Sequence, residues 1–178
     1  MPSTYHFLEK VIDEIVQMYQ DAGVELTAFH VGGDEVPEGI WEGSSICRTF
    51  MQENGLTKIR DLKDYFLEQI LEMLDKRNIQ AVGWQDIVMN PDNTVNEHFR
   101  NSKVLNYCWN TIPEQGGDEV PYKLANAGYP VILCNVGNFY LDMAYCYHVE
   151  EPGLRWGGYV DEYVTVSYTH LTLPTILR

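Results

Sequence analysis

Residues 26–37 read Leu-Thr-Ala-Phe-His-Val-Gly-Gly-Asp-Glu-Val-Pro, a short apolar run that turns abruptly polar. The first half, up to Val31, is rich in apolar and β-branched residues, which predicts a strand. Gly32 and Gly33 then remove two consecutive Cβ atoms, so the backbone can bend sharply or let a ligand approach closely. Two carboxylates, Asp34 and Glu35, follow directly. This order predicts a buried strand whose carboxyl end carries an acidic turn.

The acidic pair has two interpretations. Adjacent side chains of a regular strand point to opposite faces, so Asp34 and Glu35 could not share one ligand there. At the carboxyl end of a strand, where the chain leaves the sheet, they can converge, and parallel α/β folds bind ligands at that end. An Asp-Glu pair alone is usually a solvated loop. The diglycine in front of it and the apolar strand behind it favour a site.

The composition excludes some partners. The chain has 178 residues and a formal net charge of −14, with a pI near 4.6. Nucleic acids and anionic membrane surfaces are bound by a surplus of Lys and Arg, so this charge argues against both. A neutral, hydroxyl-rich ligand is compatible with it. Twelve Tyr and four Trp supply flat surfaces that both sugar pockets and ordinary cores use.

Cysteine spacing and hydropathy argue against a metal and a membrane span. The four cysteines form no Cys-x-x-Cys pair, and no His lies at zinc-finger spacing. Free thiols are expected, with a disulfide as the alternative. No apolar run is long enough to span a membrane, and the first residues lack the apolar region of a signal peptide. We therefore expect no metal, no cofactor and no membrane-spanning helix.

Hydrophobic periodicity divides the chain into alternating helices and strands. The expected helices are residues 3–22, part of 38–56, 58–77 and 118–126, with Gly23 ending the first and Asn78 as a left-handed cap of the third. The expected strands are residues 26–31, 79–84, 103–109 and 130–135, and a long loop rich in glycine and aromatic residues follows at 136–163. This alternation predicts a parallel sheet joined by right-handed crossovers.

Polar and aromatic residues of functional type follow each expected strand. The four sets are Asp34-Glu35, Trp84-Gln85-Asp86, Trp109-Asn110, and Tyr140 with Asp142. Strand ends that converge on one rim are typical of a (β/α)8 barrel, which takes roughly 250 residues. We therefore expect an α/β fold in which residues 1–164 form an incomplete (β/α)8 TIM barrel, about half of one.

The last stretch, residues 165–178, differs from the rest in composition. Every Asp and Glu of the chain lies at or before Glu162, and the tail has none. We interpret residues 165–178 as a non-native or disordered tail and leave them out of the fold. A genuine edge strand is the structural alternative.

The segment His30-Val31-Gly32-Gly33-Asp34-Glu35 resembles the signature of the β-N-acetylhexosaminidases of glycoside hydrolase family 20. Other segments match in the same order: Trp84-Gln85-Asp86 is similar to the family's Trp-x-acid segment, Trp109 to its second pocket tryptophan, and Tyr140-Leu141-Asp142 to its Tyr-x-Asp element. The resemblance covers about Ser3 to Glu162 and implies that the four strands are about strands 4 to 7 of the barrel. It also implies hydrolysis of terminal β-linked N-acetylhexosamine, GlcNAc or GalNAc, from glycans, and a secreted, periplasmic or lysosomal setting.

The family's mechanism implies a role for each matching residue. It is a retaining, substrate-assisted reaction in which the sugar's own 2-acetamido oxygen is the nucleophile and an oxazolinium-type intermediate forms. Glu35 would be the general acid and then the base, with a pKa raised by burial beside Asp34. Asp34 would hold the acetamido N–H, and Tyr140 would donate a hydrogen bond to the acetamido oxygen.

The remaining matches would bind the sugar. Trp84 and Trp109 would wall the pocket, and Asp142 would bind a sugar hydroxyl. As structural alternatives, the tryptophans are rim core, and Asp142 and Tyr140 are only hydrogen-bonding loop residues. His30 has the strand parity of Asp34 and is counted with the substrate-binding residues, although a satisfied interior histidine is favoured over a catalytic one.

Two neighbouring residues are not assigned to the site. Asp86 could cap the segment that follows it, and Trp156 of the aromatic loop could be a packing residue.

Three features of the family have no counterpart in this sequence: a sugar-binding Arg near the first barrel strand, and a Trp and a Glu near the last. We therefore expect the chain alone to be an inactive or poorly folded fragment with two open sheet edges. One alternative is a metal-dependent barrel hydrolase with His30, Asp34 and Glu35 as ligands, although the other histidines lie in loops without ligand spacing. Another alternative is a non-catalytic sugar-binding module on a decayed barrel, which would not need a proton donor.

Overall fold

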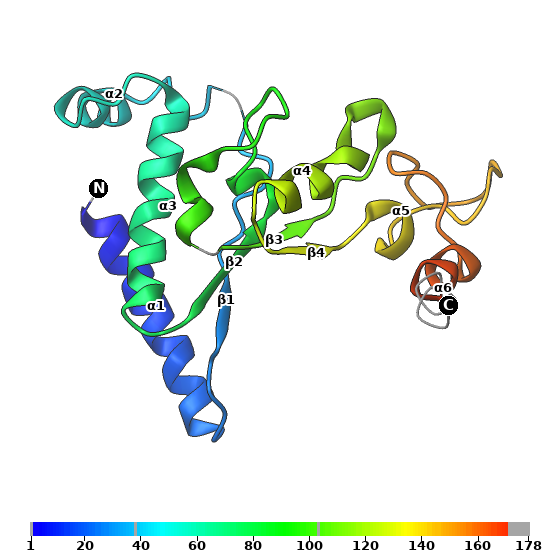
Figure 1. Cartoon of the computed structure of the whole chain (residues 1–178), viewed down its shortest axis with the longest axis horizontal. Helices are drawn as coiled ribbons and strands as arrows, with labels where there is room; N and C mark the ends of the chain where they lie inside the picture. Colours follow the sequence, from blue (N-terminus) through cyan, green and yellow to red (C-terminus); the bar gives the residue numbers. More distant parts are fainter. Residues whose placement is uncertain (1, 38, 103, 171–178) are drawn as a thin grey trace.

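A four-stranded parallel sheet lies at the centre of the computed structural model, which describes residues 2–37, 39–102 and 104–170. The strands are β1 (Ala28–His30), β2 (Gln80–Trp84), β3 (Leu105–Cys108) and β4 (Val131–Leu133). They lie side by side in chain order (Figure 1), and each neighbouring pair is parallel. The predicted parallel α/β sheet is therefore confirmed, with shorter strands than the sequence suggested.

Helices cover one face of this sheet (Figure 1). They are α1 (Pro2–Asp21), α3 (Ile59–Asp75) and α4 (Val120–Asn126), close to the predicted ranges. Asn78 has the predicted left-handed backbone, with φ 54°. The core between helices and sheet contains side chains with no solvent exposure: Leu74, Val88, Val104, Cys108 and Leu124. Because these residues come from both layers, the core holds the strand ends in fixed positions.

The other face of the sheet is uncovered and carries a cluster of rings. His30 of β1, Trp84 of β2 and Tyr107 of β3 lie on three successive strands, and each ring meets the other two edge to face. The ring centroids of His30 and Tyr107 are 5.2 Å apart although β2 lies between their strands. The side chains therefore converge on this face, as they do on the concave side of a curved sheet.

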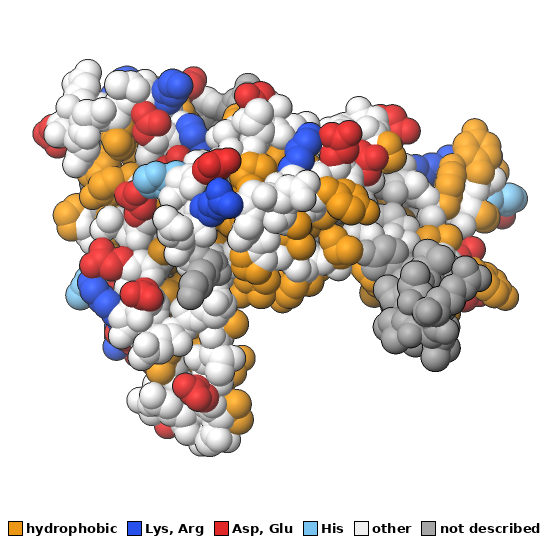
Figure 2. All heavy atoms as spheres, viewed as in Figure 1, with side chains coloured by type: hydrophobic (Ala, Val, Ile, Leu, Met, Phe, Trp, Pro, Cys, Tyr) orange, Lys and Arg blue, Asp and Glu red, His pale blue; other side chains and the backbone are white. Residues whose placement is uncertain are grey.

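Apolar side chains are also exposed beside the last strand. Ile132 and Leu133 of β4 are accessible to solvent, and Figure 2 shows hydrophobic side chains gathered on the side of the molecule where β4 lies. Within the described residues, β1 and β4 each pair with one strand only. The sheet thus has two open edges, as the sequence predicted.

The connections contain short helices. The partly helical region after β1 contains α2 (Ser45–Glu53), and the connections after β2 and β3 contain four 3-10 helices: η1 (Gln85–Ile87), η2 (Glu97–Ser102), η3 (Pro113–Gln115) and η4 (Gly117–Glu119). The predicted loop at 136–163 is not wholly irregular, because α5 (Val136–Phe139) lies within it and α6 (Glu162–His170) begins at its end. Residues 165–170 of the predicted tail belong to α6, and residues 171–178 lie outside the described residues.

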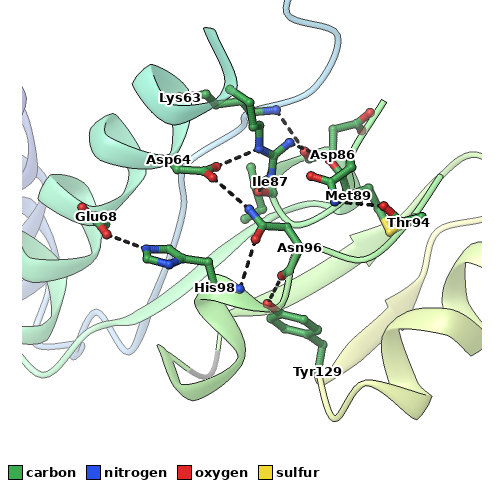
Figure 3. Close-up of polar contacts among 12 residues, drawn as sticks. Lys63, Asp64, Glu68, Asp86, Ile87, Met89, Thr94, Asn96, His98 and Tyr129 are labelled. Carbon is green, nitrogen blue, oxygen red and sulfur yellow. Dashed lines mark hydrogen bonds and ion pairs between the residues drawn. The ribbon is translucent and has the colours of Figure 1, made fainter. Parts of the chain in front are cut away.

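A polar network fixes the segment after β2 against α3. Arg60 forms a half-buried ion pair with Asp64, with 2.8 Å between Nε and Oδ1, and donates hydrogen bonds to the carbonyl oxygens of Ile87 and Met89. Asn96 donates to the other carboxylate oxygen of Asp64 at 3.0 Å, and Figure 3 shows the two side chains facing each other. The loop beyond β2 is therefore held by charge-assisted hydrogen bonds.

The cysteines are free thiols, as expected: Cys108 is buried, Cys47 and Cys134 are half-buried, and Cys146 is exposed. In the described ranges, no helix has the length and apolar character needed to cross a membrane.

Candidate active site

The turn after β1 has an unusual backbone. Gly32 and Gly33 have φ values of 71° and 92°, and Glu35 has φ 44°. Glycine tolerates positive φ without cost, whereas a glutamate there is strained by roughly 1 kcal/mol or more. The backbone has left the β conformation by Gly32, so the side chains of Asp34 and Glu35 need not point to opposite faces as they would in a strand. Both can therefore face one cavity, as the sequence predicted for a strand end.

Ile87 of η1 explains why the turn needs glycine. An added Cβ at Gly33 would lie 2.1 Å from Ile87 Cγ2, and an added Cβ at Gly83 would lie 2.5 Å from Ile87 Cδ1. Ile87 is only 2% exposed, so it has no free space into which it could move. The acidic turn thus packs directly against the first residues after β2, and this contact fixes the position of the turn.

A cavity of about 170 Å³ lies at the carboxyl ends of the strands. Its lining residues come from the turn after β1, the end of β2, the segment after β3 and the loop after β4: Asp34, Glu35, Trp84, Trp109, Tyr140 and Trp156. Five of the seven residues predicted for the site therefore meet in one place. This cavity is the candidate active site.

Trp109 is held in place by the segment after β2. Its indole Nε1 donates to Asp86 Oδ2 at 2.8 Å, and its backbone N–H donates to Gln85 Oε1 at 3.1 Å. The Gln85 side chain is buried and also accepts the backbone N–H of Asn110 at 3.3 Å. Asp86 thus fixes the plane of the Trp109 ring, which the sequence-based alternative of a capping residue did not anticipate.

Trp156 and Tyr140 reach the cavity because the loop after α5 folds back on itself. The backbone of Leu154 donates to Asp142 O at 2.7 Å, and that of Ala144 donates to Leu154 O at 2.7 Å. The Trp156 ring centroid then lies 5.8 Å from Tyr140 and 6.1 Å from Trp109. Trp156, which was not assigned to the site from the sequence, therefore lines the cavity.

Electrostatics favour a protonated Tyr140. Burial raises the pKa of the Tyr140 hydroxyl, and the negative charges of Asp34, Asp142 and Glu35, together with the Cys134 thiol, raise it further. A hydroxyl that keeps its proton remains a hydrogen-bond donor. Tyr140 can therefore donate to a ligand oxygen in the cavity.

His30 has a structural position next to the site. Its Nδ1 accepts the backbone N–H of Gly32 at 3.1 Å, and burial lowers the pKa of the imidazole, while Asp34 opposes this shift. A neutral ring with Nδ1 as acceptor supports the first residue of the acidic turn. His30 and Asp142 are absent from the described lining of the cavity; His30 instead contacts the Trp84 ring, at 5.0 Å between centroids.

One expectation about the carboxylates is wrong for this chain. Asp34 and Glu35 were expected to be buried beside each other, yet both side chains are exposed to solvent. Their exposure shows that little of the described chain covers these two side chains.

The metal-dependent alternative finds no ligand cluster in the described ranges. There, no group of three or more His, Cys, Asp or Glu residues is arranged to hold a metal ion. The Nδ1 atom of His30 already accepts a backbone hydrogen bond, which leaves only its Nε2 as a ligand.

Comparison with known proteins identifies the family. Residues 1–174 match the family model described as "Glycosyl hydrolase family 20, catalytic domain". The chain therefore belongs to glycoside hydrolase family 20, as its motifs suggested.

Individual relatives agree with this assignment. The chain is 31% identical over 158 residues to a beta-hexosaminidase of Vibrio vulnificus, covering 88% of this chain and 18% of that protein. It is 28% identical over 185 residues to N,N'-diacetylchitobiase of Vibrio harveyi, covering 88% of this chain and 21% of that protein. The chain thus spans about a fifth of the length of these curated relatives.

Solved structures show the same fold. The crystal structure of a family 20 exo-β-N-acetylglucosaminidase from Vibrio harveyi, in complex with N-acetylglucosamine, superimposes with a TM-score of 0.74 at 27% identity. The match covers 94% of this chain and 24% of that one. The sheet and helices described above therefore have the arrangement of the corresponding part of a family 20 enzyme.

Proposed function

We propose that this chain is the part of a family 20 barrel that carries strands 4 to 7, and that the whole protein hydrolyses terminal β-linked N-acetylhexosamine. The observation that supports this most is the cavity at the strand ends, where two carboxylates, a tyrosine and three tryptophans meet. An aromatic wall with a few polar groups is the usual composition of a sugar site. The uncovered sheet face and its two open edges fit a sheet that continues into further strands.

In this proposal, Glu35 protonates the glycosidic oxygen as it leaves and then deprotonates the attacking water. Asp34 accepts a hydrogen bond from the acetamido N–H, which aligns the acetamido oxygen with the anomeric carbon and balances the developing positive charge. Tyr140 donates to the acetamido oxygen, a role that fits the raised pKa of its hydroxyl. Asp142 binds a sugar hydroxyl. The acetamido oxygen of the substrate is the nucleophile, so neither carboxylate has to form a covalent bond.

The aromatic walls complete the sugar pocket. Trp84 and Trp109 flank the acetamido group and the ring face, and Trp156 joins them from the loop after α5. Asp86 acts through Trp109, whose indole it holds at 2.8 Å. A ring fixed in this way leaves the acetamido group little freedom, which favours attack by its oxygen.

The experiment that tests this proposal is the substitution Asp34→Asn in the full-length protein, because the 178 residues alone are expected to give no sustained hydrolysis. An asparagine of the same shape carries no charge, so the acetamido group loses the carboxylate that balances its developing positive charge. We expect kcat/KM for 4-nitrophenyl β-N-acetylglucosaminide to fall about 10²- to 10³-fold, as when one preorganised group is removed from an active site. Asp118→Asn, on η4, is the matched control and should keep the native rate. A native protein without turnover would favour the non-catalytic sugar-binding alternative, and an Asp34→Asn protein with the native rate would contradict the role of Asp34 in orienting the acetamido group.

A further inference from the structure

The 3-10 helix η1 contacts two separate parts of the candidate active site. Ile87 packs against the acidic turn, because an added Cβ at Gly33 would lie 2.1 Å from Ile87 Cγ2. Asp86, the residue before Ile87, accepts the indole N–H of Trp109 at 2.8 Å. One short segment therefore fixes both the turn that carries the carboxylates and one aromatic wall of the cavity. A displacement of η1 would move the two together.

The position of η1 is set by helix α3. η1 has only three residues, and 3-10 helices have poorer hydrogen-bond geometry than α-helices. Two cations of α3 donate to the carbonyl groups of η1 and of the residue just beyond it. Lys63 donates to Asp86 O at 2.9 Å (Figure 3), and Arg60 donates to Ile87 O at 3.0 Å and to Met89 O at 2.6 Å.

All three nitrogens of the Arg60 guanidinium have partners within the chain. Nε pairs with Asp64 Oδ1 at 2.8 Å, and Nη1 and Nη2 donate to the two carbonyl oxygens just described. The Arg60 side chain is only 18% exposed, and it is absent from the described lining of the cavity. Charge-assisted hydrogen bonds are about twice as strong as those between neutral groups. Arg60 therefore acts on the site through η1 and not on a ligand in the cavity.

Asp64 fixes the orientation of Arg60. Its second carboxylate oxygen accepts a hydrogen bond from Asn96 Nδ2 at 3.0 Å, and the backbone N–H of Asn96 donates to Val88 O at 2.8 Å. The carboxylate is thus held between α3 and the same segment that Arg60 binds. A guanidinium presents its donors in a rigid planar fork, whereas a lysine ammonium is a single point charge. A lysine at position 60 can pair with Asp64, but it cannot also hold two carbonyl groups in fixed directions.

We propose that Arg60 is a positioning residue for hydrolysis, because its hydrogen bonds to Ile87 O and Met89 O hold η1 in the place from which η1 fixes the acidic turn and Trp109. This inference rests on the proposed function, in which Asp34 and Trp109 align the acetamido group of the substrate. Without the fork of Arg60, η1 is released and these two parts of the site lose their fixed spacing. A misplacement of about 1 Å by a substitution remote from the chemistry can lower a rate about 10²-fold.

The test measures kcat and KM of Arg60→Ala and Arg60→Lys in the full-length protein, with 4-nitrophenyl β-N-acetylglucosaminide as the substrate. The assays are run well below the unfolding temperature of each variant, so that the protein is folded throughout. We expect kcat to fall about 10- to 100-fold in Arg60→Ala and about 10-fold in Arg60→Lys, with KM within about threefold of the native value. The loss falls on kcat because the cavity walls still bind the sugar while its acetamido oxygen is misaligned.

Arg77 provides a matched control. Its side chain is 20% exposed and pairs with Asp13 at 2.6 Å and with Glu9 at 3.4 Å. Arg77 lies between α3 and the start of β2, and thus near the amino ends of the strands, whereas the cavity lies at their carboxyl ends. Arg77→Ala should lower the unfolding temperature, because it breaks half-buried ion pairs to α1, and it should keep the native kcat.

A fluorine NMR spectrum reports on Trp109 without any turnover. In protein labelled with 5-fluorotryptophan, the Trp109 resonance is the one that is missing from the spectrum of Trp109→Phe. We expect this resonance to shift or broaden in both Arg60 variants, because the indole loses its fixed place beside Asp86. It should stay unchanged in Arg77→Ala.

Native kcat in a folded Arg60→Ala protein would overturn the inference, and so would a loss confined to KM. An equal loss of kcat in Arg77→Ala, or an unchanged Trp109 resonance in an Arg60 variant with reduced kcat, would overturn it as well. If Arg60→Ala does not fold, Arg60→Lys decides by the same measurements. A native protein without turnover would instead overturn the proposed function, and the inference with it.

Discussion

Replacing Glu35 by glutamine in the full-length protein is expected to lower kcat/KM for an oligosaccharide about 10²- to 10⁴-fold, the contribution of a positioned general acid. Glu35 lines the cavity at the strand ends, where the proposed function places the glycosidic oxygen. A glutamine has nearly the same shape but carries no proton that it can transfer. Stopped assays of released N-acetylglucosamine measure the loss.

The leaving group provides the diagnostic comparison for Glu35→Gln. An aryl group that departs as a stable phenolate needs less protonation, so its kcat/KM should fall less than that of an oligosaccharide. Glu114→Gln, on η3, is the matched control and should leave both rates unchanged. Equal losses for good and poor leaving groups would show that Glu35 is not the proton donor.

The second large effect is expected at Gly33. Gly33→Ala should destabilise the protein by roughly 2 to 5 kcal/mol, the sum of an overpacked contact and a left-handed backbone for a residue with a Cβ. The new Cβ would lie 2.1 Å from Ile87 Cγ2, and either Ile87 or the acidic turn has to move. Since this turn carries Asp34 and Glu35, hydrolysis should fall together with the unfolding temperature. Thermal denaturation and kcat/KM measure the two effects.

Gly23 provides a matched control for this prediction. Gly23 also has a left-handed backbone, with φ 71°, but no atom lies within 4 Å of an added Cβ. Gly23→Ala should therefore lower the free energy of unfolding only through the left-handed backbone that alanine disfavours, by about 1 to 2 kcal/mol. Ile87→Ala should cost less stability in the Gly33→Ala protein than in the native protein, because the two sites share one contact. If Gly33→Ala lowers the free energy of unfolding by no more than Gly23→Ala does, the contact with Ile87 does not fix the position of the turn.

Most of the fold could be predicted from periodicity and turn chemistry. The helix that Gly23 ends, the strand before the diglycine and the left-handed Asn78 all depend on local backbone preferences, which a sequence shows directly. The predicted strand at residues 26–31 pairs only over Ala28–His30, because pairing depends on the neighbouring strand rather than on local propensity. The small helices after β4 carry too few residues to show a period.

The candidate site could be predicted where its residues lie at a strand end or shortly beyond one. Asp34, Trp84 and Trp109 do so, and the structure brings them together. Trp156 could not be found in this way, since it reaches the cavity only because a loop of some twenty residues folds back through hydrogen bonds near Asp142. The hydrogen bond from the Trp109 indole to Asp86 could not be predicted either, because it depends on contact between two different strand ends.

The most direct test of the account is to compare 4-nitrophenyl β-N-acetylglucosaminide with 4-nitrophenyl β-glucoside as substrates of the full-length native protein. The two substrates differ only at position 2 of the sugar, where the glucoside has a hydroxyl in place of the acetamido nucleophile. Since intramolecular nucleophiles reach effective molarities of about 10⁵ to 10⁸ M, the account predicts that kcat/KM for the glucoside is lower by at least about 10³-fold. Comparable rates for the two substrates would contradict it, because Asp34 and Tyr140 would then have no acetamido group to orient.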